Sequence, residues 1–416
     1  MSRMPRREFL RTGALAAGGA LLGMRLALAR AAGANGRRPR FVLVIMRGAL
    51  DGMAAVPPYG DRDYEALRRE FALRAPGQSG AALPLDGFFG LHPSLKFLGQ
   101  CYAARELIVL HAVASPYRER SHFDGQDVLE NGTPRPHALQ TGWLNRALAQ
   151  LPGARESGVA LGQNVPLVMR GPAQVASWSP SRLSAPDEDT LARLTDLYAG
   201  DALLAGRLAD ALAANAIAAE DGAQAMAQGA GADMAVKGGG ARPGNARYTE
   251  IVRAAAGFLR QEDGPQVAVF DTTGWDTHAN EGAAEGQLAG RLAALDGGLA
   301  TLRQELGAAW AQTAVLLVTE FGRTAAINGT RGTDHGTATA AFLAGGAVAG
   351  GRVVADWPGL SARALYEGRD LAPTLDLRSV LKGLLAEHLG VASRALAQEV
   401  FPDSERARAL TGLVRA

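Results

Sequence analysis

Acidic and histidine side chains recur in this sequence where its apolar segments end. Five short loops carry them: Arg47–Met53, Ser121–Asp127, Gly274–His278, Thr319–Arg323 and Thr333–Gly336. Carboxylate oxygens and imidazole nitrogens suit zinc, manganese or magnesium better than they suit soft metals. One or two such ions would neutralise the charge that develops on a phosphoryl-like group during its transfer. The loops therefore predict a divalent-metal site.

The residue types within these loops suggest individual roles. The candidate metal ligands are Asp51, Asp276, His278, Glu320, Asp334 and His335. Ser121 opens a predicted helix, where the helix N-terminus favours an anion, so we interpret it as a nucleophile with His122 as the alternative. Arg323 could bind an anionic substrate, or it could pair with carboxylates of the site. Alternatively, Asp51 could be a turn residue and Ser121 could be a helix cap, without a role in chemistry.

The elements that would position these loops are buried strands followed by amphipathic helices. The predicted strands are Phe41–Met46, Leu107–Val113, Val267–Phe270, Ala314–Val318 and Ala340–Leu343. Continuous apolar strands are typical of a parallel sheet covered on both faces. Predicted helices include Gln287–Leu306 and Leu377–Leu389, the second with Asp376 as its N-cap. Ligands of such sheets bind beyond the carboxyl ends of the strands, where the acidic loops lie.

The five loops also carry a family resemblance when they are taken together. In order they read RGALDGM, SHFDGQD, GWDTH, TEFGR and TDHG, between about Arg40 and about Leu389. This set resembles the domain-of-unknown-function family 1501, which is itself similar to the alkaline phosphatase and sulfatase superfamily. The resemblance implies a three-layer α/β/α fold with a mostly parallel central sheet and a site for one or two divalent metals. Asp51 would be the first metal ligand and Ser121 the nucleophile.

The same resemblance assigns the remaining ligands and exposes two departures. Asp276 and His278 match a cluster of an acid followed by a histidine, and His335 matches the last histidine, with Asp334 beside it. However, the acid and histidine of that cluster are closer together than in the phosphatases. Glu320 replaces the usual Asp-His pair. One metal, or a site without turnover, are therefore the alternatives to a full pair of zinc ions.

The N-terminus has the pattern of a twin-arginine export signal. Arg6 and Arg7 precede an apolar run that is too short to span a membrane stably, and small residues follow it. We assign residues 1–32 to the signal and residues 38–416 to one domain, exported by the twin-arginine translocase to the periplasm or the medium. A basic disordered arm and an uncleaved anchor are the alternatives, and Arg25 argues against the anchor. No stable membrane span is expected after cleavage.

Composition excludes several classes of function. The formal net charge is only +2, so a nucleic-acid-binding surface is not expected. The single cysteine, Cys101, excludes an internal disulfide, and its place inside a predicted helix argues against the modified cysteine of sulfatases. An Ala/Gly-rich stretch at about residues 185–246 is interpreted as a helical insertion. We expect a hydrolase of phosphate or sulfate esters acting on an unknown anionic substrate, or else an exported binding or assembly protein without turnover.

Overall fold

A nine-stranded sheet forms the centre of the molecule. The computed structural model describes residues 38–151, 157–180, 188–229 and 243–415, so the predicted signal at 1–32 lies outside them. The strands are β1 (Arg40–Arg47), β4 (Leu107–Ala114), β5 (Gly158–Leu161), β6 (Val175–Trp178), β7 (Val267–Thr273), β8 (Thr313–Val318), β9 (Thr339–Ala344), β10 (Arg352–Val354) and β11 (Leu375–Asp376). They lie in the order β10-β4-β9-β8-β1-β7-β5-β6, and β11 pairs with β4. A separate small hairpin joins β2 (Leu83–Pro84) and β3 (Gly90–Leu91).

The predicted mixed α/β class with a mostly parallel sheet is confirmed. Only β9 runs antiparallel to its neighbours, β4 and β8. The central strand β1 is parallel to β7 and β8, and Ile45 is level with Asp271 on one side and Val318 on the other. Because these three carboxyl ends are aligned, the loops that follow them leave the sheet at one edge.

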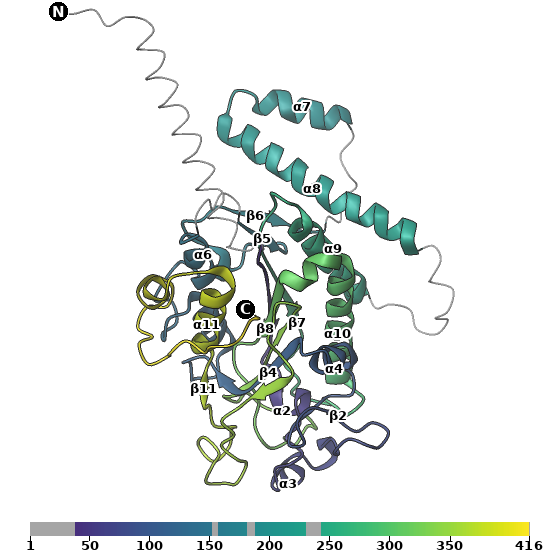
Figure 1. The fold of residues 1–416 in the computed structure, drawn as a ribbon, viewed down its shortest axis with the longest axis vertical. Helices are drawn as coiled ribbons and strands as arrows, with labels where there is room; N and C mark the ends of the chain where they lie inside the picture. The colour runs from purple at the N-terminus through teal and green to yellow at the C-terminus, as the bar shows by residue number, and fades with distance from the viewer. Residues whose placement is uncertain (1–37, 152–156, 181–187, 230–242, 416) are drawn as a thin grey trace, which may run out of the picture. The chain divides into compact units, whose positions relative to one another are not determined.

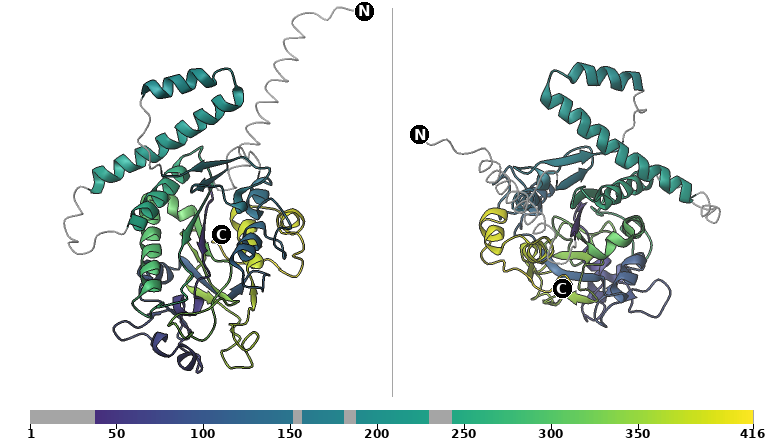
Figure 2. Two further views of the ribbon diagram at one scale, coloured as in Figure 1. Left: turned by 180° about the vertical axis from the view of Figure 1, so that it is seen from behind. Right: turned by 45° about the horizontal axis from the view of Figure 1, so that its top comes forward.

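Two apolar cores form because successive residues of each buried strand point to opposite faces of the sheet. Val42 and Val44 of β1 belong to the core that includes α4 (Lys96–Ala103), α9 (Pro243–Arg260) and α10 (Gln287–Leu306). Leu43 and Ile45 belong to the core that includes α6 (Trp143–Leu148) and α11 (Leu377–Leu389). Figures 1 and 2 show these two groups of helices on either side of the strands.

The predicted helices agree closely with the observed ones. Both α10 and α11 have the predicted bounds, and the Asp376 side chain caps α11 by accepting a hydrogen bond from the backbone N–H of Arg378. The remaining α-helices are α2 (Gly52–Ala55), α3 (Tyr64–Arg68), α5 (His122–Asn131), α7 (Glu188–Tyr198), α8 (Ala202–Gly229) and α12 (Ser393–Ala395).

The stretch expected to be a helical insertion contains α7, α8 and the start of α9. α9 continues to Arg260 and packs against α10 and β7, so its second half belongs to the core of the domain. The triple glycine at 238–240 lies outside the described residues. No helix in the described part of the chain is both long and apolar enough to cross a membrane.

Candidate metal centre

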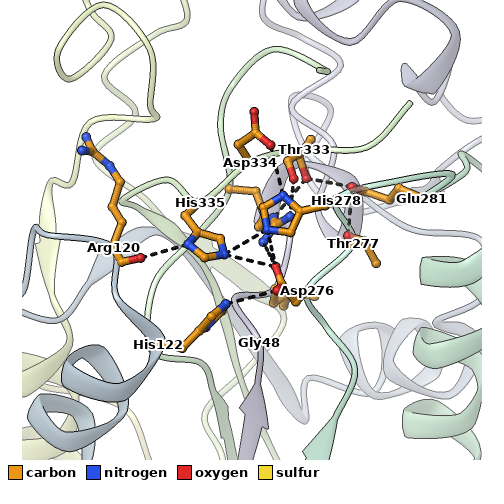
Figure 3. A network of polar contacts seen from close by, with 12 residues as sticks. Gly48, Arg120, His122, Asp276, Thr277, His278, Glu281, Thr333, Asp334 and His335 are labelled. Atoms are coloured by element: carbon orange, nitrogen blue, oxygen red, sulfur yellow. Dashed lines mark hydrogen bonds and ion pairs between the residues drawn. The ribbon is translucent and has the colours of Figure 1, made fainter. Parts of the chain in front are cut away.

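Three histidine side chains converge on the carboxylate of Asp276 (Figure 3). The Nε2 atoms of His122 and His335 each lie 3.3 Å from an Asp276 oxygen, and the Nε2 of His278 lies 3.0 Å from one. His278 and His335 also bring their Nε2 atoms to 3.0 Å from each other. Coordinating atoms of His122, Asp276 and His335 all lie within 4.8 Å of one another, which is close enough for one cation to contact all three.

The opposite nitrogen of each imidazole is held by an oxygen acceptor. The Nδ1 of His122 lies 2.8 Å from Glu320 Oε1, that of His335 lies 2.9 Å from the backbone oxygen of Arg120, and that of His278 lies 3.1 Å from Asp334 Oδ1. An Nδ1–H that donates to oxygen leaves the Nε2 lone pair free, which is the tautomer that binds a metal. The Nε2 of His122 is in fact buried without a hydrogen-bond partner. The three imidazoles therefore present lone pairs toward Asp276.

Glu320, the partner of His122, is fully buried directly after β8. Its Oε1 accepts hydrogen bonds from the backbone N–H of Gly48 at 2.8 Å and from the Gln126 amide at 3.1 Å, in addition to His122. Burial favours the neutral acid, but these donors, with His122 the strongest, hold the pKa of Glu320 below its usual range. An ionised Glu320 supports His122 rather than contacting Asp276 directly.

Arg323 supports the other side of the group. Its guanidinium is buried, donates to Asp276 Oδ1 at 2.5 Å and to the Thr333 hydroxyl at 3.2 Å, and also binds the backbone carbonyl of Thr333. Partial burial would raise the pKa of Asp276, but the hydrogen bond and charge of Arg323 lower it. Arg323 therefore keeps Asp276 ionised and ties it to the loop that carries His335.

Electrostatic effects and burial shift the pKa values of His122 and His335 in opposite directions. The hydrogen bond that His122 donates to Glu320, aided by the charges of Glu320 and Asp276, raises the pKa of His122. Burial, followed by the positive charge of a protonated His122, lowers the pKa of His335. In the absence of a cation a proton therefore occupies His122 before His335, and that proton must leave before a metal can bind His122.

Two glycines allow the loops to approach each other closely. A Cβ on Gly48, whose φ is +120°, would lie 2.8 Å from the backbone nitrogen of Asp276. A Cβ on Gly336 would lie 2.3 Å from the backbone carbonyl of Arg323, which forms an isolated bridge with His335. The first acidic loop thus contributes Gly48 to the centre, as a close backbone contact and as a donor to Glu320.

Asp51 is placed differently from the expectation for a first metal ligand. It is fully buried, caps α2 through the backbone N–H of Ala54, and forms a two-point ion pair with the buried guanidinium of Arg68. Burial works against its ionisation, but Arg68 lowers the pKa of Asp51. Among the described residues it forms no hydrogen bond or ion pair with His122, Asp276 or His335; the helix cap accounts for one of its hydrogen bonds and Arg68 for the others. A metal-ligand role for Asp51 stays a prediction without geometric support.

Comparison with known proteins identifies the family. The model of the family described as "Protein of unknown function (DUF1501)" matches residues 109–400, which is more than half of the chain. The chain belongs to the DUF1501 family. No curated protein sequence matches it.

Two solved structures are similar to this DUF1501 protein. One is titled "Crystal structure of Ps i-CgsB in complex with k-i-k-neocarrahexaose", with 10% identity, a TM-score of 0.41, and coverage of 90% of this chain and 77% of that chain. The other, titled "Crystal structure of Ps i-CgsB", has 10% identity, a TM-score of 0.37 and the same coverage. At these TM-scores the likeness is a loose similarity of chain path.

The DUF1501 motifs thus bring most of the predicted site residues together. His122, His278 and His335 all lie against Asp276, and Glu320, Asp334 and Arg323 contact this group from behind. Ser121 is the N-cap residue of α5, but its hydroxyl makes no capping bond and no hydrogen bond to this group in the described structure. Its role as a nucleophile stays a prediction.

Several residues around the centre were not identified from the sequence. Arg68 neutralises Asp51 from a position 17 residues away, and nothing in the sequence links the two. Glu281 accepts hydrogen bonds from the Thr277 and Thr333 hydroxyls. Its position three residues after His278 is the feature of the sequence that could have identified it. The Asn328 amide donates to Asp334 at 2.9 Å.

The other four histidines and the cysteine form no hydrogen bond or ion pair with the residues of the centre in the described structure. His92, His111 and His388 are buried or nearly so and bond to backbone carbonyls, whereas His137 is exposed beside Asp124 and Asp127. Cys101 is buried in α4, and burial raises its pKa to about 12, so the thiol is not poised for reaction.

Proposed function

We propose that this protein binds one divalent cation at His122, Asp276, His278 and His335 and hydrolyses phosphate or sulfate esters. The observation that carries the proposal is the orientation of the imidazoles, because each Nδ1 is bound by an oxygen and each Nε2 faces Asp276. Oxygen acceptors behind metal-binding histidines are typical of metal centres in proteins. Zinc and manganese suit three nitrogens and one oxygen better than magnesium does.

The cation would act as a Lewis acid toward an anionic ester. The chain's own residues would orient the reaction. Arg323 holds Asp276 ionised, Glu320 fixes the tautomer of His122, and Ser121 at the start of the ten-residue α5 is the proposed nucleophile. The three-layer arrangement of the alkaline phosphatase type is part of this proposal, as is export through the twin-arginine pathway. Arg6→Lys with Arg7→Lys is expected to keep the protein in the cytoplasm.

The decisive experiment measures bound metal and ester hydrolysis on the same preparation. The mature protein, purified without added metal, is analysed for divalent ions and then assayed with aryl phosphate and aryl sulfate esters. We expect His335→Ala to lose the ion and Ser121→Ala to keep the ion but lose hydrolysis. His137→Ala removes a largely exposed histidine outside the centre and serves as the matched control. A protein that takes up no zinc or manganese would refute the proposal.

A second candidate, an exported binding or assembly protein without turnover, is favoured by one observation. The buried Asp51–Arg68 ion pair occupies the carboxylate that the phosphatase pattern would use as its first ligand. A single cation can hold an anionic ligand without cleaving it. A metal-loaded protein that leaves every ester intact, and on which Ser121→Ala has no effect, would support this second candidate.

A further inference from the structure

A large pocket lies next to the loops that carry the candidate metal centre. Its volume is about 1530 Å³, which is more than a small organic ester fills. Its wall includes the carboxyl ends of β5 and β7 together with parts of α5, α9 and α10. Phe123 and Trp275 belong to this wall, and they are the immediate chain neighbours of His122 and Asp276. The wall also includes Gln126, whose amide donates to Glu320, so the pocket and the metal centre share neighbouring residues.

Guanidinium groups dominate the charge that the pocket offers to a ligand. Arg170, Arg247 and Arg291 line it, and none of them forms an ion pair with another described residue. The Nε of Arg291 is buried and has no hydrogen-bond partner. A buried unpaired donor is costly unless a ligand or water completes it. These three arginines are therefore available to bind negative charge.

The carboxylates of the same wall are already occupied. Asp271 and Glu130 both bind Arg47, at 2.6 and 2.8 Å. Asp127 accepts hydrogen bonds from the Asn131 amide and from the backbone of His137. These carboxylates therefore neutralise the positive charge of the three arginines less than a simple count of charges suggests.

Arg291 also links the pocket to the metal centre. A Cβ on Gly274 would lie 2.5 Å from its Nη1, so the guanidinium rests on the backbone two residues before Asp276. Phe123, another residue of the pocket wall, is 87% exposed, although it directly follows His122, whose Nε2 is buried. The pocket wall thus carries an arginine and an exposed phenylalanine, each close in the chain or in space to a residue of the centre.

We infer that the pocket binds an anionic carbohydrate, with sulfate or phosphate groups on Arg170, Arg247 and Arg291 and a sugar ring against Phe123. The remaining wall supports this class, because amides of Gln163, Asn164 and Gln287 can hydrogen-bond to hydroxyl groups. An aromatic face packs against the apolar face of a sugar ring. The status of this ligand as a substrate rests on the proposed ester hydrolase, but its binding to the pocket does not.

The test uses the full mature protein and a labelled, fully sulfated heparin-derived hexasaccharide as the probe. Binding is measured by fluorescence anisotropy with and without bound metal. We expect Arg247→Gln and Arg291→Gln each to raise Kd by about 10-fold or more, because each removes charge-assisted hydrogen bonds. Arg291→Lys should recover part of the loss, and Phe123→Ala should weaken binding without affecting the fold. Arg62→Gln, at a side chain 89% exposed and outside the pocket wall, is the matched control.

The outcomes separate this inference from the proposed function. Binding that persists in the metal-free protein and depends on Arg247 and Arg291 supports the inference, whatever the metal and ester assays give. Equal affinity for the chemically desulfated hexasaccharide would overturn it, as would an unchanged Kd in the Arg247→Gln/Arg291→Gln double variant. Tighter binding of a single-stranded oligonucleotide of equal charge would overturn it in favour of nucleic acid.

Discussion

Replacing Glu320 by glutamine tests whether the histidines form a metal centre. Glutamine keeps an oxygen that can accept from His122, Gly48 and Gln126, while its amide nitrogen can face the Thr319 hydroxyl that now donates to Oε2. The substitution therefore removes the negative charge with little change in shape. A neutral acceptor makes the Nδ1–H bond weaker and the Nε2 of His122 a poorer ligand.

The expected size of the effect follows from the burial of this contact. Partners behind a metal-binding histidine typically contribute about 10- to 100-fold in metal affinity, or about 1.4 to 2.8 kcal/mol. Glu320 is fully buried, so the upper half of that range is expected. The corresponding Asp334→Asn change removes a carboxylate that is 51% exposed and screened by water, and it should cost less than about 10-fold.

The assay is a competition titration of zinc between the protein and a chromogenic chelator. The wild-type affinity should fall as pH falls through the raised pKa of His122, because a proton then competes for Nε2. Glu320→Gln lowers that pKa, so the difference between the two proteins should shrink between about pH 8 and about pH 6. An unchanged zinc affinity in Glu320→Gln, with a melting temperature equal to the wild type, would refute the metal centre as described.

Three further predictions concern stability and loop geometry. Arg68→Ala leaves Asp51 buried and unpaired, so the free energy of unfolding measured in urea should fall by about 3 to 5 kcal/mol. A loss of less than about 1 kcal/mol would mean that water solvates the ion pair. Gly336→Ala places a Cβ 2.3 Å from a backbone carbonyl oxygen and should reduce metal content, whereas Gly329→Ala, which meets no atom within 4 Å, should not. Burial and the charge of Asp51 raise the pKa of Glu281 to about 8, so its contribution to stability is present at low pH and is lost as pH rises through that value. Glu281→Gln should therefore flatten the stability profile between about pH 4.5 and about pH 8, and an unaltered profile would count against a protonated Glu281.

The fold was largely predictable because its main strands are buried on both faces. Such strands are continuous apolar runs, so β1, β4, β7, β8 and β9 stand out in the sequence. The strands β5 and β6 have only four residues each, which is too short for a clear pattern, and β6 is mostly half exposed. The antiparallel direction of β9 could not be predicted either, because a buried run has the same composition in both directions.

The candidate site was predictable in part for a related reason. Aligned strand ends bring the loops after β7 and β8 to one edge of the sheet, so Asp276 and Glu320 were expected to lie close together. Which way a carboxylate turns within its loop depends on partners elsewhere in the chain. Asp51 turns toward Arg68, a residue on α3, and that contact has no signature in the first loop.

Charge balance supports the proposal of one divalent cation rather than two. The histidines contact three carboxylates, Asp276, Glu320 and Asp334, and Arg323 contributes one positive charge, which leaves two net negative charges when the imidazoles are neutral. One divalent ion offsets that charge in a partly buried setting, where an uncompensated charge is costly. A second ion would need a further free carboxylate, and Asp51 is already neutralised by Arg68. The departure of the second acidic cluster from the phosphatase pattern and the Asp51–Arg68 pair thus both support the proposal of one cation rather than two.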